Sequence, residues 1–136
     1  MGKTALIVED EIFVALDLER ILTDAGYSVC AIAADSETAR EAASAAACDF
    51  ALVDVNLRDG CTGPRIAREL AAQGVKVVFV TANPAQIGEP AAGLGYVRKP
   101  FSEAAILAAA RLAEAGEEPA ANDDVRLIGR SDATAG

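Results

Sequence analysis

Short apolar runs alternate with amphipathic stretches along most of the chain. The runs predict buried strands at residues 4–8, 28–33, 50–53 and 75–80, and a further strand around 96–97. Between them, apolar residues recur at helical spacing, which predicts helices over about 11–25, 36–47 and 64–73 and a last helix after residue 102. This alternation is typical of a parallel sheet with helices on both faces. We therefore expect an α/β fold with a doubly wound, five-stranded parallel sheet.

Two regions break this pattern. Residues 82–95 contain two prolines and three glycines, and inside a helix each Gly costs about 1 kcal/mol and each Pro about 3 kcal/mol. A long regular helix is therefore not expected there. Residues 117–136 are acidic and polar, and they are too few to fold alone. We expect one domain over residues 3–116 and a C-terminal tail over 117–136, in which residues 125–128 could dock on the domain.

Composition limits the classes of function. The chain has 136 residues and a formal net charge of −9, and no basic patch stands out, so neither nucleic acid nor a membrane surface is an expected partner. No apolar run is long enough to span a membrane, and no signal peptide is visible, which predicts a cytoplasmic protein.

The three cysteines are odd in number and widely spaced, which argues against a disulfide framework or a zinc site. Cys30 and Cys48 are expected to be small buried residues. Cys61 falls in a predicted loop near Asp54, where a reactive thiol is the alternative to an inert one.

Residues that can do chemistry follow four of the predicted strands. Glu9 and Asp10 follow the first, Asp54 the third, Thr81 the fourth and Lys99 the fifth. The carboxyl ends of parallel strands meet at one edge of the sheet, where open α/β sheets bind their ligands. We therefore expect these side chains to converge on one site.

Three carboxylates in one cleft repel each other unless a cation is present. An all-oxygen set of this kind suits Mg²⁺, so Glu9, Asp10 and Asp54 predict a magnesium site. A carboxylate can also act as a nucleophile toward phosphorus. Lys99 and Thr81 would then contact the oxygens of the phosphoryl group, so the predicted reaction class is phosphoryl transfer.

In their order along the chain, these residues resemble the receiver domain of two-component response regulators. The matching positions are Glu9-Asp10, Asp54, Thr81-Ala82 and Lys99-Pro100-Phe101. The resemblance covers about residues 3–116, and its specificity lies in the order of all four motifs rather than in any one. It implies a flavodoxin-like fold with strand order 2-1-3-4-5. It also implies a signalling protein that supports only its own phosphorylation and dephosphorylation, not an enzyme.

The resemblance also implies roles for single residues. Asp54 would be the phosphoacceptor, supplied by the phosphohistidine of a histidine kinase or a phosphotransfer protein. Asp10 would be a direct Mg²⁺ ligand, with Glu9 close by and the backbone carbonyl of Asn56 as a further ligand.

Three more roles follow from the same resemblance. Thr81 and Lys99 would hold the phosphoryl group. Tyr96 matches the aromatic residue that changes rotamer as Thr81 moves inward, with plain packing as the alternative. The Lys99–Pro100 bond is expected to be cis.

The sequence departs from the usual receiver pattern between Thr81 and Lys99, where its segment is shorter than in most members of the family. A similar shortened segment occurs in some single-domain and stress-response receivers of alphaproteobacteria. We hypothesise that residues 82–95 are an order–disorder element biased by phosphorylation. We expect a stand-alone receiver that either binds a downstream protein partner or drains phosphate from a kinase as a sink.

Two rival functions remain. A pseudo-receiver would keep the fold and act as an interaction domain without ever taking phosphate. An aspartate-based phosphatase of the haloacid dehalogenase type requires a second acid two residues after its nucleophile, and Asn56 cannot perform that role.

Overall fold

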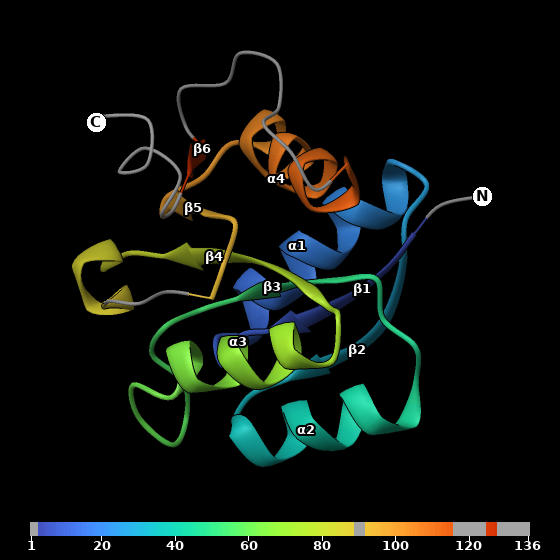
Figure 1. Ribbon diagram of the computed structural model, residues 1–136. Coiled ribbons are helices and arrows are strands. Elements are labelled where there is room, and N and C mark those ends of the chain that lie inside the picture. The colour runs from blue at the N-terminus through green and yellow to red at the C-terminus, as the bar shows by residue number, and fades with distance from the viewer. Residues whose placement is uncertain (1–2, 89–91, 116–124, 128–136) are drawn as a thin grey trace, which may run out of the picture.

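A six-stranded sheet forms the centre of the molecule (Figure 1). The computed structural model describes residues 3–88, 92–115 and 125–127. The strands lie in the order β2 (Ser28–Ala33), β1 (Thr4–Val8), β3 (Phe50–Val53), β4 (Lys76–Thr81), β5 (Gly95–Arg98) and β6 (Val125–Leu127). The first five are parallel, which confirms the predicted α/β class and the order 2-1-3-4-5. β6 runs antiparallel to β5 and extends the sheet beyond the predicted five strands.

Helices cover both faces of the sheet (Figure 1). The helices α1 (Ile12–Asp24) and α4 (Glu103–Ala115) pack on one face, and α2 (Ser36–Ala45) and α3 (Gly63–Ala72) pack on the other. Successive side chains of a strand point to opposite faces, so Ile7 joins the core under α1 and α4 while Leu6 joins the core under α2 and α3. Burial on both faces explains why β1 is apolar at every position after Thr4.

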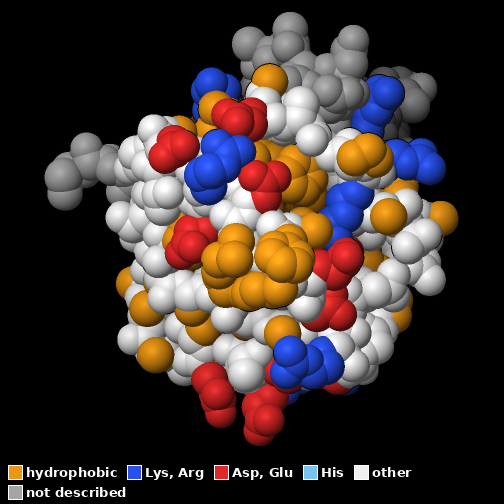
Figure 2. Space-filling view, turned by 180° about the vertical axis from the view of Figure 1, so that it is seen from behind, with side chains coloured by type: hydrophobic (Ala, Val, Ile, Leu, Met, Phe, Trp, Pro, Cys, Tyr) orange, Lys and Arg blue, Asp and Glu red, His pale blue; other side chains and the backbone are white. Residues whose placement is uncertain are grey.

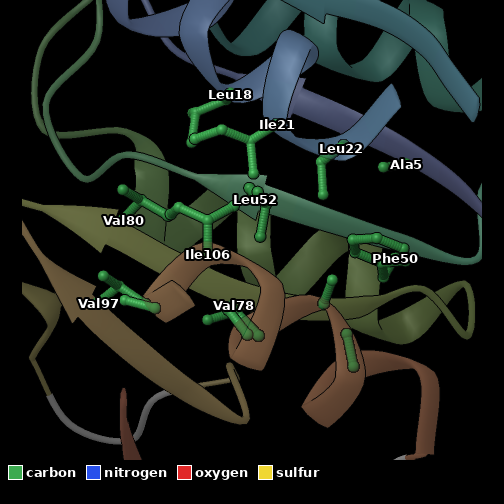
Figure 3. Close-up of a cluster of buried hydrophobic side chains, with 14 of the residues drawn as sticks. Ala5, Leu18, Ile21, Leu22, Phe50, Leu52, Val78, Val80, Val97 and Ile106 are labelled. Carbon is green, nitrogen blue, oxygen red and sulfur yellow. The ribbon is translucent and has the colours of Figure 1, made fainter. Parts of the chain in front are cut away.

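The core beneath α1 and α4 fixes these two helices against the middle of the sheet. Figure 3 shows Leu18, Ile21 and Leu22 of α1 directed toward the sheet, and Ile106 of α4 lies in the same cluster. All four side chains are at most 2% exposed. Burial of a Leu or Ile side chain stabilises a fold by roughly 1.5–3 kcal/mol, so this cluster holds α1 and α4 against the sheet.

Local signals set the ends of the helices. The Asp35 side chain accepts a hydrogen bond of 2.9 Å from the Thr38 N–H and caps α2, as predicted. That helix ends at Ala45, earlier than the predicted residue 47, because Ala46 already has extended backbone angles. The predicted cap of the last helix is also present, since the Ser102 hydroxyl accepts a hydrogen bond from the Ala105 N–H.

The segment after β4 holds no regular α-helix among its described residues. It contains η1 (Pro84–Ile87), a short 3₁₀-helix that is followed by Gly88, where φ is +77°. Residues 89–91 of this segment lie outside the described residues. The prediction that no long helix forms here is therefore confirmed for the described residues. The order–disorder transition stays a prediction.

Only a small part of the predicted C-terminal tail is described. Within it, Val125 of β6 packs into the core beside Val97 of β5. The division into a domain over 3–116 and a tail over 117–136 stays a prediction. Across the described ranges, no helix has the length and apolar character needed to cross a membrane.

Candidate functional site

The ends of β1, β3 and β5 bring three charged side chains into direct contact. The Nζ atom of Lys99 lies 2.8 Å from Oδ2 of Asp54 and 2.8 Å from Oε1 of Glu9. The two carboxylate side chains are 8% and 1% exposed, and the lysine side chain is 13% exposed. The Lys99–Pro100 bond is cis, as predicted. Residues far apart in the sequence thus form one nearly buried ionic cluster at the carboxyl edge of the sheet.

The charge balance within this cluster is uneven. Burial raises the pKa of Glu9 to about 7, although Lys99 and the Glu11 N–H both lower it. Burial alone would lower the pKa of Lys99, but its bonds with Asp54 and Glu9 outweigh that effect and raise it. One ammonium cannot neutralise two buried carboxylates. Lys99 therefore stays charged, and the charged form of Glu9 is the one that becomes less favourable.

Glu9 also keeps one oxygen atom short of partners. Oε2 accepts a hydrogen bond of 3.1 Å from the Glu11 N–H. Oε1 is buried, and its charged neighbour is the Lys99 ammonium at 2.8 Å, which Asp54 shares. A buried carboxylate oxygen with so little compensation is available to a further cation or to a water bound to one.

A cavity of about 280 Å³ opens above the cluster. Its walls are Asp10, Glu11, Asp54, Asn56, Ala82, Asn83 and Lys99. Asp54 accepts a hydrogen bond of 2.7 Å from the Val55 N–H through Oδ1 and bonds Lys99 through Oδ2. The phosphoacceptor expected from the sequence therefore borders a space open to solvent, with its carboxylate held on two sides.

The third carboxylate of the cluster is one that the sequence reasoning missed. Ligand oxygens of Glu9, Glu11 and Asp54 lie within 4.8 Å of one another, and Asp10 is not in this set. Asp10 is exposed and lines the same cavity. The pattern of strand ends indicates Glu9 and Asp10 but not Glu11, which lies one residue beyond them. Its position two residues after Glu9 and just before α1 was the signal that could have found it.

The residues present fit a magnesium ion. The carboxylates supply only oxygen atoms, which Mg²⁺ prefers, and they outnumber the single ammonium among them. Burial of two carboxylates around one shared ammonium and the raised pKa of Glu9 indicate that negative charge here is under-compensated. A divalent cation held by these acids would relieve that imbalance.

Asn56 and Thr81 are each tied to the segment that follows β4. The Asn56 Nδ2 atom donates to Oε1 of Gln86 in η1 at 2.7 Å. The Thr81 hydroxyl oxygen accepts a hydrogen bond of 3.0 Å from the Asn83 N–H, and Thr81 is fully buried. Neither contact was foreseen, since both depend on the path of the chain after β4. They connect the cavity walls with the segment that replaces a regular helix.

Tyr96 lies farther along the sheet. In the strand ladder its direct neighbours are Phe79 of β4 and Arg126 of β6. Its half-buried ring packs against the core under α2 and α3 and lines a hollow of about 710 Å³ next to Lys99. The Tyr96 ring therefore has open space on one side. The role of Tyr96 as a switch stays a prediction.

Gly63 allows the loop before α3 to come close to the site. Its N–H donates to the Val55 carbonyl at 3.0 Å. A Cβ atom at this position would collide with the backbone carbonyl of Asp54. A glycine here thus permits the tight approach of α3 to the strand end that carries Asp54.

Comparison with known proteins decides the family. Residues 5–111 match the response regulator receiver domain. The chain belongs to the receiver domain family. Receiver domains of two-component systems are signalling proteins that interact with histidine kinases and generally bind Mg²⁺ at an acidic pocket. The four sequence motifs and the fold agree with this membership.

Several receivers are similar to this chain. The phyllosphere-induced regulator PhyR of Methylorubrum extorquens is 31% identical over 112 residues, which are 79% of this chain and 42% of that protein. The transcriptional regulatory protein PdtaR of Mycobacterium tuberculosis is 30% identical over 118 residues, which are 82% of this chain and 56% of that protein. The chain thus spans about half the length of these curated relatives, or less.

The structural comparison gives the same family. The receiver domain of PhyR from Erythrobacter litoralis has a TM-score of 0.79 and 28% identity, and the match covers 89% of this chain and 97% of that one. A receiver domain of a modulated diguanylate cyclase from Desulfovibrio desulfuricans has a TM-score of 0.77 and 27% identity, with 85% and 96% covered. The fold is therefore shared along nearly the whole of both domains.

Proposed function

We propose that this receiver accepts a phosphoryl group on Asp54 from the phosphohistidine of a histidine kinase or a phosphotransfer protein. The observation that carries the proposal is the position of the Asp54 carboxylate, which borders the open cavity and lies 2.8 Å from the Lys99 ammonium. An oxygen of this carboxylate would attack phosphorus and form an acyl phosphate. The phosphorus–nitrogen bond would break, and its electron pair would return to the imidazole, which takes up a proton.

Residues around Asp54 would stabilise the charge that develops on the phosphoryl oxygens. Lys99 would remain close to the new acyl phosphate because Asp54 and Glu9 already hold its ammonium in place. Among the described residues, the Thr81 hydroxyl accepts a hydrogen bond and donates none, so its proton could be donated to a phosphoryl oxygen. Both residues then act by positioning and electrostatics rather than by covalent chemistry.

Magnesium would be held by acidic residues on the wall of the same cavity. We assign it to the carboxylates of Asp10 and Asp54 and the backbone carbonyl of Asn56, with Glu9 adjacent. Asp10 is exposed on the cavity wall, and Asp54 borders the same space. When bound, the ion would neutralise charge on the incoming phosphoryl group. Glu11 would add negative charge nearby without being an essential ligand.

The first turns of α1 offer a surface on which the donor protein could dock. Ile12, Phe13 and Leu16 are 56%, 84% and 45% exposed, which is unusual for large apolar side chains. Figure 2 shows hydrophobic side chains gathered on this side of the molecule, with acidic and basic side chains around them. Because α1 begins directly after Glu11, a helical partner on this surface would have its phosphohistidine near Asp54.

The signal would leave the domain through a protein partner, or the domain would act as a phosphate sink. A sink requires rapid loss of the phosphoryl group, whereas a partner-binding output depends less on it. The PhyR of Bartonella quintana, to which this chain is 26% identical, is described as an anti-anti-sigma factor. A protein partner is therefore the output that we favour here.

Phosphotransfer tests both the chemistry and the docking surface. A histidine kinase encoded near this protein, carrying labelled phosphohistidine, is mixed with the wild-type chain, with Asp54→Ala and with Phe13→Ser. Label should move to the wild type, not to Asp54→Ala, and at least about tenfold more slowly to Phe13→Ser if its side chain is an interface anchor. A small phosphodonor should phosphorylate Phe13→Ser and the wild type equally. If the kinase phosphorylated the wild type and Phe13→Ser at equal rates, α1 would not be the docking surface.

A further inference from the structure

Two cysteines that are far apart in the sequence lie side by side on the α2 face of the sheet. The Sγ atoms of Cys30 and Cys48 are 2.9 Å apart, and both side chains are half-buried. This separation is shorter than an ordinary non-bonded contact between two sulfur atoms, and a disulfide bond measures about 2.05 Å. Cys30 and Cys48 are therefore not only small, partly buried residues. They form a thiol pair that their wide spacing in the sequence does not indicate.

A β-bulge turns Cys30 toward its partner. In the ladder between β1 and β2, Ala5 pairs with Val29 and Leu6 pairs with Ala31, so Cys30 is the extra residue. Cys30 and Ala31 consequently both pack on the face of α2 and α3, although consecutive strand residues normally point to opposite faces. Cys48, in the connection between α2 and β3, packs on this same face.

The surroundings of the pair favour a covalent bond between the thiols over a metal site. A structural zinc ion requires four ligands, commonly thiolates and imidazoles. Among the described residues, the only group of three or more potential metal ligands is Glu9, Glu11 and Asp54, which does not include either cysteine. The chain has no histidine at all. Within the described part of the chain, the other polar contact of the Cys48 thiol is a long one of 3.8 Å to the Ala46 carbonyl.

We propose that Cys30 and Cys48 form an intramolecular disulfide by exchange with a low-molecular-weight disulfide, which makes this pair a redox modification site. One protein thiolate attacks the small disulfide, forms a mixed disulfide and releases one small thiol. The second protein thiol loses its proton and attacks the protein sulfur of the mixed disulfide, which releases the second small thiol. The two protein sulfurs together lose two electrons, and the small disulfide gains them.

The first attack is assigned to Cys30. Burial, with a further contribution from Cys30 itself, raises the pKa of the Cys48 thiol to about 12, so Cys48 is rarely a thiolate. Cys48 then acts as the resolving thiol, and it already lies within contact distance of Cys30.

The bond would fasten the edge strand β2 to the start of β3. Cys48 precedes β3 and Asp54 follows it, so the crosslink and the proposed phosphoacceptor are at opposite ends of that strand. Oxidation should therefore stabilise the fold and leave phosphorylation of Asp54 unchanged. A failure of this proposal can thus be told apart from a failure of the phosphoacceptor proposal.

The test uses the full chain with Cys61→Ser, which removes the exposed third thiol. The fully reduced protein is incubated with excess oxidised glutathione at mildly alkaline pH, alkylated in denaturant and weighed intact. We expect no alkylation, no glutathione adduct and the mass of the monomer less two hydrogens. The oxidised form should also melt roughly 5 °C or more above the reduced form. Two alkylated thiols, two glutathione adducts or a covalent dimer would each overturn the proposal.

Matched variants show whether the pairing is specific. In the Cys61→Ser background, Cys30→Ser and Cys48→Ser should each retain one thiol that is alkylated or carries one glutathione, and neither should gain thermal stability on oxidation. Oxidation of the unfolded Cys61→Ser chain in denaturant should yield at least about tenfold less disulfide at the same glutathione ratio, because the fold holds the thiols together. Equal yields in the folded and unfolded chains would contradict a site built by the structure.

Discussion

The ammonium group of Lys99 lies 2.8 Å from a carboxylate oxygen of Glu9 whose side chain is almost completely buried. The same ammonium lies 2.8 Å from Asp54, so a single cation serves two acids at the edge of the sheet. The two acids raise the pKa of Lys99, whereas burial raises the pKa of Glu9 even though the shared ammonium lowers it. Without Lys99 or a metal ion, the two buried carboxylates would destabilise the fold. The shared ammonium also sets the charge around Asp54.

Removal of the shared cation should destabilise the fold. Lys99→Met leaves Glu9 and Asp54 buried without their common partner, which should cost about 2 kcal/mol of unfolding free energy in magnesium-free buffer. Urea denaturation measures this loss. Arg98→Met is the matched control, because Arg98 is adjacent and exposed, and it should change stability by less than about 0.5 kcal/mol. Similar losses for the two variants would mean that the cluster does not depend on the Lys99 charge.

Magnesium affinity should separate the roles of two neighbouring acids. Asp10→Asn removes a proposed direct ligand and should weaken Mg²⁺ binding by about tenfold or more. Glu11→Gln removes a carboxylate that is 67% exposed, so screening should limit the loss to less than about threefold. Calorimetric titration with Mg²⁺ measures both. The opposite ranking would place the ion among Glu9, Glu11 and Asp54 instead.

The segment after β4 should respond to the state of Asp54. The Asn56–Gln86 and Thr81–Asn83 hydrogen bonds link the cavity walls to residues 82–88. With Mg²⁺ and beryllofluoride as a phosphate mimic, amide exchange over residues 82–88 should slow several-fold relative to Mg²⁺ alone. Gln86→Ala should reduce this response, and Gln73→Ala, on the exposed end of α3, should not. Equal protection with and without the mimic would refute the order–disorder hypothesis.

The buried strands and the convergence of their ends could be predicted from the sequence. Runs such as residues 5–8 and 50–53 are apolar at every position because both faces of the sheet are covered, and the carboxyl ends of parallel strands lie at one edge. The topology places Asp54 and Lys99 at the same edge of the sheet, although β4 lies between their strands. Among the described residues after β4 there is no long helix, which the prolines and glycines of this segment also predict.

The features that could not be predicted depend on contacts between segments distant in the sequence. Glu11 joins the acidic cluster only because its carboxylate turns back from the start of α1 toward Glu9. The hydrophobic pattern does not indicate the bulge at Cys30, so the contact between Cys30 and Cys48 could not be predicted. β6 is a short run in a polar stretch, and its pairing with β5 depends on the exposed edge of a sheet that must already exist.

The most direct test of the central claim is intact mass spectrometry after incubation with a small phosphodonor. The wild-type chain, treated with acetyl phosphate and Mg²⁺, should gain the mass of a single phosphoryl group, and a chelator should abolish the gain. Asp54→Ala should gain nothing under the same conditions, while Asp59→Ala, a nearby acid outside the cavity wall, should still be phosphorylated. No added mass on the wild type would identify a pseudo-receiver, and the same addition on Asp54→Ala would place the acceptor elsewhere; either result would contradict the assignment of Asp54.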